Sequence, residues 1–265
     1  MEAVVVPAMS TGGEQMGRLP VPSLRLVQPP AQTGILRKLR PTKIRSGVRR
    51  RWFLHQMARL PLAAPAEPLV EAGSAYGAWI VPSNVEPDWT CYCIGIGGDF
   101  SLEQHLLETG ATVRSVDPHE PFVQDARTGL RAFDRFSAHY GAIADHTGTV
   151  TMQAHHEAIS SSLSAAHLYD SKDTCEVPAL TLSSLLNECG DQRIDLLKLD
   201  VEGLEYDLIP KIDLRGLGVR VFATQFHHNR SARDARRIIH HLESLGYRHV
   251  AQRPVCKLTF LHQQR

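Results

Sequence analysis

Four carboxylates follow one apolar run in the segment "KLDVEGLEYDLI". Asp200, Glu202, Glu205 and Asp207 could accept a proton in catalysis, bind a divalent cation, or open a helix. The apolar residues before Asp200 predict a buried strand, so Asp200 would emerge at its carboxyl end. Glu205 and Asp207 fit the first turn of the following helix, whereas Asp200 and Glu202 fit the floor of a site.

Two adjacent histidines stand at the end of another apolar run, "VFATQFHH". In a strand, side chains two apart share a face, so His227 and Gln225 would point one way and His228 the other. At most one histidine would therefore enter the site, and we prefer His227. A general base helps a poorly nucleophilic hydroxyl. Asp200, Glu202 and His227 are accordingly the predicted catalytic residues.

The same three residues, Asp200, Glu202 and His227, would also form an oxygen and nitrogen set suitable for Mg²⁺ or Mn²⁺. Six of the 14 histidines of this chain occur as adjacent pairs, at positions 155–156, 227–228 and 240–241. They therefore lack the spacing of four residues that places two ligands on one face of a helix. The sequence favours a site without a metal, with a divalent cation as the alternative.

A glycine-rich loop follows the first predicted strand in "CIGIGGDF", with Gly95 and Gly97. Phe100 departs from the dinucleotide-binding pattern, which disfavours a nicotinamide cofactor, and no phosphate-binding loop of the GxxxxGK type occurs. Asp117 lies about 20 residues further on, where folds of this kind hold a ribose. A ribose without a demanding pyrophosphate site fits S-adenosylmethionine (SAM). A tight turn and a strand-ending Asp-Pro would explain the same residues without a ligand.

Strands and helices alternate from residue 89 to residue 246, which predicts a doubly wound α/β sheet with mostly parallel strands. The last two strands have no helix between them, so their pairing should be antiparallel. Ser231 should cap the last helix. Residues 146–152 suggest a hairpin arm with Gly148 at its turn, and residues 155–174 an irregular surface segment. Strands are expected at 89–97, 111–118, 137–144, 193–200, 217–228, 248–252 and 256–263, and helices at 48–60, 101–110, 121–136, 180–190 and 231–246.

Composition divides the 265 residues into unequal parts. Residues 1–45 are basic and contain several prolines, which predicts a disordered tail and makes contact with nucleic acid or anionic lipid the less favoured reading. Residues 46–75 form a helix and linker, and residues 76–265 one globular domain. No apolar run is long enough to span a membrane, and five scattered cysteines suit reduced thiols, so a cytoplasmic protein is expected.

Four segments resemble the FkbM-type methyltransferase family: "IDLLKLDVEGLEYDLI", "CYCIGIGGDFSLEQHLLETGATVRSVDP", "VPALTLSSLL" and "TQFHHN". They span most of residues 76–250. The resemblance implies a seven-stranded, Rossmann-like class I fold that uses SAM. It also implies O-methylation of a hydroxyl on a small metabolite, such as a sugar or a polyketide-like compound. A non-catalytic binding or regulatory protein on the same fold is the alternative.

The resemblance also implies roles for individual residues. Gly95 and Gly97 would face the methionine and ribose parts of SAM, and Asp117 would hold the ribose diol. Asp99 would order the loop or meet the amino group of the cofactor, and the segment around Ala142 would lie near the adenine. Asp200 and Glu202 would border the methyl group and the acceptor.

Overall fold

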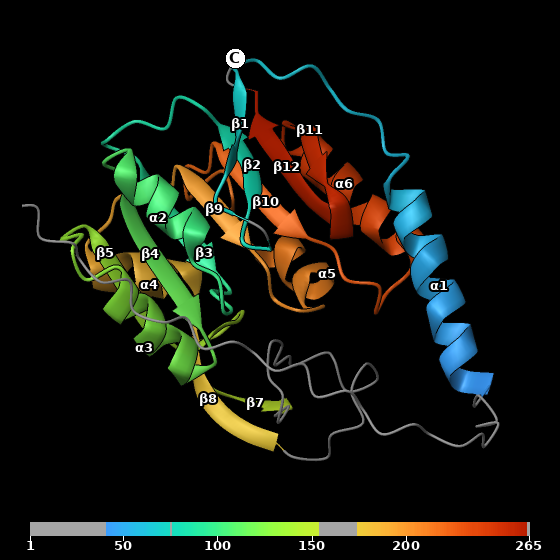
Figure 1. Cartoon of the computed structure of the whole chain (residues 1–265), viewed down its shortest axis with the longest axis horizontal. Helices are drawn as coiled ribbons and strands as arrows, with labels where there is room; N and C mark the ends of the chain where they lie inside the picture. Colours follow the sequence, from blue (N-terminus) through green and yellow to red (C-terminus); the bar gives the residue numbers. More distant parts are fainter. Residues whose placement is uncertain (1–40, 75, 154–173, 264–265) are drawn as a thin grey trace, which may run out of the picture. The chain divides into compact units, whose positions relative to one another are not determined.

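A seven-stranded sheet forms the centre of the computed structural model, which describes residues 41–74, 76–153 and 174–263 (Figure 1). The strand order is β11-β12-β10-β9-β3-β4-β5. All neighbouring strands are parallel except that β12 is antiparallel to both β10 and β11. The predicted doubly wound sheet with antiparallel C-terminal pairing is therefore confirmed. The strands are β3 Thr90–Ile94, β4 Thr112–Asp117, β5 Phe136–Tyr140, β9 Leu196–Leu199, β10 Val221–Gln225, β11 Tyr247–Arg253 and β12 Lys257–His262.

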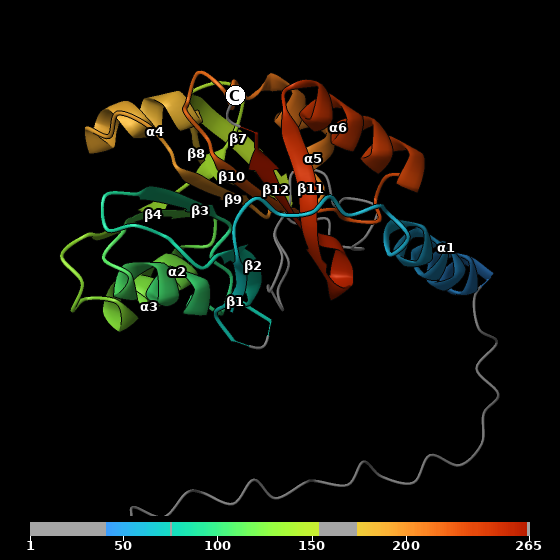
Figure 2. The same cartoon turned by 90° about the horizontal axis from the view of Figure 1, so that it is seen from above.

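Helices cover both faces of this sheet, as Figure 2 shows. Helices α2 (Ser101–Glu108) and α3 (Glu120–Gly129) lie on one face, and α4 (Leu182–Cys189), α5 (Glu205–Leu208) and α6 (Ala232–Ser244) on the other. The central strands β9 and β10 are buried along their whole length, because both of their faces are covered. The near-continuous apolar runs in the sequence follow from this burial.

Helix ends follow the local sequence closely. Ser231 caps α6 as predicted, and it exchanges hydrogen bonds with Asp234 in a capping box. Thr181 and Ser184 form the same arrangement at α4, which ends at the left-handed Gly190. The helix expected directly after Gly203 is short: α5 is one turn long and continues as a 3₁₀ turn, η2 (Ile209–Lys211).

The helix and the strand expected between residues 121 and 144 are wrong in their extent. Helix α3 ends at Gly129 rather than at residue 136, because Leu130 and Phe133 pack into the core from a turn. The single strand expected at 137–144 is divided between β5 and β6 (Ala142–Ile143). Strand β6 belongs to a second sheet of order β6-β8-β7, with β7 at Gly148–Gln153 and β8 at Thr174–Leu180.

The second sheet replaces the predicted hairpin arm. Strand β7 begins at Gly148 and pairs antiparallel with β8, which the sequence patterns did not predict. The irregular segment expected at 155–174 lies outside the described residues except for Thr174, the first residue of β8.

Before the main sheet, the chain forms one helix and one hairpin. Helix α1 (Pro41–Met57) begins seven residues earlier than expected and buries Phe53 and Met57 in the core. Strands β1 (Leu69–Ala72) and β2 (Trp79–Pro82) pair antiparallel, and the domain boundary expected at residue 76 lies between them. The tail expected at 1–45 lies outside the described residues up to residue 40, while residues 41–45 start α1. The described residues include no helix that is long and apolar enough to cross a membrane.

Candidate active site

A pocket opens at the carboxyl ends of β3, β4 and β9, where ligands bind in sheets of this kind. Most of the residues predicted from the sequence line it, and they come from separate parts of the chain. His227 does not line the pocket itself, but it contacts two residues that do. The predicted residues in the lining are Gly95, Gly97, Asp99, Asp117, Ala142, Asp200 and Glu202.

The glycine loop leaves β3 in direct contact with the end of β9. A side chain at Gly95 would place its Cβ 2.1 Å from the Asp200 carbonyl oxygen, so only glycine allows this approach. At Gly97 a Cβ would meet no atom within 4 Å. The loop thus packs tightly against Asp200 at one glycine and leaves open space at the other.

Asp117 at the end of β4 holds this loop. Its side chain is 5% exposed. One carboxylate oxygen accepts a hydrogen bond from the Gly97 N–H at 3.0 Å, and the other accepts one from the His119 N–H at 2.7 Å. Burial raises the pKa of Asp117, and these N–H groups oppose that rise. Gly95, Gly97 and Asp117 form one side of the pocket, which we call the glycine wall.

Asp99 and Ala142 flank the glycine wall. Asp99 accepts hydrogen bonds from the N–H groups of Gly77 (2.9 Å) and Ser101 (3.0 Å), and so ties the loop to the hairpin and to the start of α2. Of the two roles expected for Asp99, these hydrogen bonds favour the ordering of the loop over contact with the amino group of the cofactor. Ala142 lies on β6 and is buried beside the pocket.

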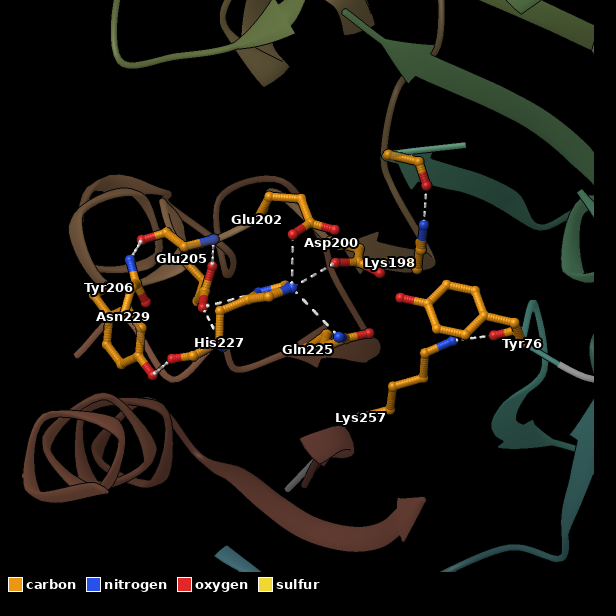
Figure 3. A network of polar contacts seen from close by, with 12 residues as sticks. Tyr76, Lys198, Asp200, Glu202, Glu205, Tyr206, Gln225, His227, Asn229 and Lys257 are labelled. Atoms are coloured by element: carbon orange, nitrogen blue, oxygen red, sulfur yellow. Dashed lines mark hydrogen bonds and ion pairs between the residues drawn. The ribbon is translucent and has the colours of Figure 1, made fainter. Parts of the chain in front are cut away.

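The predicted catalytic residues meet just beyond the ends of β9 and β10, next to the glycine wall (Figure 3). The Nε2 atom of His227 lies 3.2 Å from a carboxylate oxygen of Glu202 and 3.8 Å from one of Asp200. Their side chains are between 11% and 19% exposed. His227 also approaches Gln225, as the strand period predicted. We call Asp200, Glu202 and His227 the acidic wall.

A strained turn aims the Glu202 carboxylate into this wall. Glu202 has a φ of 50°, which is rare for a residue with a side chain, and Gly203 follows with a φ of 104°. The Asn229 amide donates a hydrogen bond to the Gly203 carbonyl at 2.9 Å. A Cβ at Gly203 would lie only 2.3 Å from that amide nitrogen, so the turn requires glycine.

Glu205 supports the acidic wall from behind, a role that its helical position did not predict. Its side chain is fully buried. One carboxylate oxygen accepts a hydrogen bond from the His227 backbone N–H at 2.6 Å and lies 3.3 Å from His227 Nδ1. The other accepts one from the Gly203 N–H at 2.8 Å. Glu205 is the last residue of the string K-x-D-x-E-G-x-E, so its place in that motif could have indicated that it belongs to the site.

These carboxylates determine the charge of His227. Burial alone would lower the pKa of the imidazole, but Glu205 and then Glu202 outweigh it, and the pKa is raised well above its ordinary value. With both ring nitrogens facing carboxylates, the protonated form of His227 is favoured as long as no cation is bound there. In that form it can donate hydrogen bonds but cannot accept a proton.

Two buried lysines between the walls were not predicted. Lys198 donates a hydrogen bond to the Gly95 carbonyl, and its Nζ lies 5.6 Å from the centre of the Trp79 ring. Lys257 donates one to the Tyr76 carbonyl and lies 4.6 Å from Trp79. Burial lowers the pKa of Lys257 to about 8. The β1–β2 hairpin supplies both aromatic residues, so missing that hairpin also concealed the lysine environment.

One further acid, Glu103 on α2, lines the pocket and is 2% exposed. Burial raises its pKa to about 7, while the charge of Lys198 acts in the opposite direction. This side chain therefore changes its charge near neutral pH.

Comparison with known proteins gives the family. The family model described as the methyltransferase FkbM domain matches residues 69–249. Among solved structures, a fibrillarin pre-rRNA processing protein from Methanococcus jannaschii is similar at 7% identity and a TM-score of 0.42, covering 76% of this chain and 84% of that chain. A SAM-dependent methyltransferase from Aquifex aeolicus is similar at 11% identity and a TM-score of 0.32, covering 66% and 80%.

The search of curated proteins found no match. The family match nevertheless spans most of the chain and includes both walls of the pocket. The seven-stranded sheet has the architecture that the sequence resemblance implied. The chain therefore belongs to the FkbM family of SAM-dependent methyltransferases.

Proposed function

We propose that the protein methylates a hydroxyl group on a small metabolite, such as a sugar or a polyketide-like compound. The observation that carries this proposal is that one pocket is lined both by the glycine wall and by Asp200 and Glu202 of the acidic wall. Methyl transfer needs both a cofactor and an acceptor in line with each other, with the acceptor proton managed nearby. A pocket whose lining combines a candidate cofactor surface with two candidate proton acceptors meets that need.

The residues of the glycine wall fit the cofactor. SAM supplies a methyl group on a positively charged sulfur when it is bound. Asp117 keeps acceptor capacity on both carboxylate oxygens beyond its N–H bonds, which suits the two hydroxyls of a ribose. The open space at Gly97 admits a ligand close to the backbone. Asp99 orders the loop, and Ala142 offers an apolar surface for the adenine.

On the acidic wall, the carboxylates are better placed than the histidine to take a proton, because they line the pocket and His227 does not. Asp200 and Glu202 line the pocket and can accept the proton of a hydroxyl as the new carbon–oxygen bond forms. His227 orients the Glu202 carboxylate, which lies 3.2 Å from its Nε2. Among the three candidates that the sequence left open, we therefore propose Asp200 or Glu202 as the base.

Methyl transfer from isotopically labelled SAM tests the proposal. The protein would be incubated with a panel of sugars and hydroxylated polyketides, and products would be analysed by mass spectrometry and NMR. We expect a labelled methoxy group on at least one acceptor, together with the demethylated cofactor S-adenosylhomocysteine (SAH). Labelled methyl groups found only on nitrogen, sulfur or carbon would contradict O-methylation. Tight SAH binding without transfer to any acceptor class would favour a non-catalytic binding protein.

A further inference from the structure

The acidic wall gathers more negative charge than its one imidazole can balance. Nε2 of His227 faces oxygens of both Asp200 and Glu202, while Nδ1 faces Glu205. The single hydrogen on Nε2 points in one direction and can form a good hydrogen bond with only one of the two carboxylates. Lys257 offsets part of the charge of Asp200, but its hydrogen bond goes to the Tyr76 carbonyl, so it leaves room for a further cation at the carboxylates.

One buried polar atom without a partner in the described part of the chain lies at this position, and another belongs to the neighbouring Gln225. Within the described residues, an oxygen of Asp200 is buried and makes no hydrogen bond. The Gln225 side chain is 6% exposed, its amide nitrogen lies 3.3 Å from His227 Nε2, and its buried oxygen also makes no hydrogen bond. Figure 3 shows Asp200, Glu202 and Gln225 converging on this ring nitrogen. Native proteins rarely leave such groups unsatisfied unless a water or an ion completes them.

The spacing of the ligand atoms suits a small divalent ion. One donor atom from each of Asp200, Glu202 and His227 can be chosen so that all lie within 4.8 Å of one another. Ligands about 2.1 Å from an octahedral ion are separated by about 3.0 Å when adjacent and about 4.2 Å when opposite. The 3.2 Å and 3.8 Å separations from His227 Nε2 fall between these values.

The support behind the histidine is also that of a metal site. A histidine that binds a metal through one nitrogen commonly directs the other toward a carboxylate, which orients the ring. Glu205 occupies that position at 3.3 Å from Nδ1 and is itself held by the Gly203 N–H. The strained backbone of Glu202 shows that the fold keeps its carboxylate here at an energetic cost.

We propose that Asp200, Glu202 and His227 bind a divalent cation of the Mg²⁺ or Mn²⁺ class, oriented by Glu205. Binding displaces the proton from Nε2 of His227, because only a neutral imidazole can be a ligand, while Nδ1 keeps its hydrogen toward Glu205. The role of the cation in catalysis rests on the proposed function. The cation would take the acceptor hydroxyl as a further ligand and make its proton more acidic. The carbon–oxygen bond then forms as the carbon–sulfur bond breaks. SAH leaves, and the hydroxyl proton passes to water or to a carboxylate. A bound cation was the less favoured alternative from the sequence alone. The geometry makes it the interpretation that we now favour.

Electron paramagnetic resonance of Mn²⁺ titrated into the full-length protein, without SAM, tests the site directly. We expect one Mn²⁺ ion bound per chain and displaced by excess Mg²⁺. Asp200→Asn and Glu202→Gln should each weaken binding by at least about tenfold, and Glu205→Gln by about 10- to 100-fold. Asp207→Asn is the matched control, because this exposed residue pairs with Arg230 outside the pocket. It should bind Mn²⁺ like the wild type.

Thermal unfolding of each variant separates loss of the site from loss of the fold. Wild-type protein that binds neither ion, or unchanged binding in both folded variants Asp200→Asn and Glu202→Gln, would overturn the cation site. A parallel SAH titration distinguishes the two proposals. SAH binding without Mn²⁺ binding would remove the cation and leave the methyltransferase function standing. Mn²⁺ binding without SAH binding would support the cation site and contradict the proposed function.

Discussion

The glycine wall and the acidic wall of the pocket are built in different ways. The glycine wall consists of backbone and one carboxylate, and Asp117 is held by N–H groups from its own neighbourhood. The acidic wall consists of side chains from two strand ends, held by a residue in strained conformation and by a buried carboxylate. Its polar atoms are not all satisfied by the described residues.

This difference indicates in which wall the buried polar atoms are satisfied by protein groups alone. In the glycine wall, both oxygens of Asp117 have hydrogen-bond partners, and the open space beside Gly97 is shaped by backbone. In the acidic wall, a buried oxygen of Asp200 accepts no hydrogen bond from the described residues. We infer that the glycine wall determines cofactor affinity, while the acidic wall determines turnover. Variants that affect one wall should therefore leave the function of the other largely intact.

The largest effect is expected for Asp200→Asn. Loss of this carboxylate should lower turnover by about 10²- to 10⁴-fold, the usual contribution of a general base or its equivalent. Measurement of SAH production with an identified acceptor would check this, with Asp207→Asn as the control of the same chemical change. Turnover within about twofold of the wild type would remove Asp200 from the mechanism.

A pair of glycine variants compares the walls by stability. Gly203→Ala should destabilise the fold by about 2–4 kcal/mol, because its Cβ would clash with the Asn229 amide in a conformation that alanine resists. Gly97→Ala should cost only about 1 kcal/mol, since its Cβ meets open space at a φ of 64°. Chemical denaturation measures both.

In cofactor binding, Gly97→Ala should have a larger effect than Gly203→Ala, the reverse of their order in stability. At Gly97 the new methyl group enters the pocket, so SAH affinity should fall by about tenfold or more. Equal losses of stability in the two variants would show that the walls do not differ as described.

A smaller effect is expected for Glu103→Gln, and it should depend on pH. The folded-state pKa of about 7 lies above the ordinary value of 4.5, so the folded protein holds this proton more strongly than the unfolded chain. Wild-type stability should therefore fall as the pH rises from about 4.5 to about 7, relative to the variant. Above pH 7 the variant should be more stable by roughly 1–3 kcal/mol. Denaturation at pH 5 and pH 8 would test this, and a variant that is less stable at pH 8 would contradict it.

Much of the fold was readable from the sequence because the strands and helices have strong local signals. Apolar runs marked the buried strands, and Ser231 marked the start of α6. The missed elements have weaker signals. Strands β1, β2 and β6 have four residues or fewer, and β8 is mostly exposed, so neither length nor apolar alternation revealed them.

The candidate site divides in the same way. The site residues found from the sequence stood at predicted strand ends, so the general architecture of the sheet brought them together. They are Gly95, Gly97, Asp117, Asp200, Glu202 and His227. Glu205, Lys198 and Lys257 were missed as site residues because their roles depend on long-range burial. A carboxylate in a helical turn or a lysine in a strand is commonly exposed, and only tertiary packing turns it inward.

The division of labour between the walls is tested most directly by calorimetric titration of SAH into the wild type, Asp117→Ala and Asp200→Asn. SAH lacks the positive sulfur of SAM, so its affinity should not depend on the charge of the acidic wall. We expect wild-type binding, a loss of about 10- to 100-fold in Asp117→Ala, and affinity within about twofold of the wild type in Asp200→Asn. Asp125→Ala, on the exposed face of α3, controls for the substitution. Absence of heat with folded wild-type protein, or equal losses in Asp117→Ala and Asp200→Asn, would contradict the account.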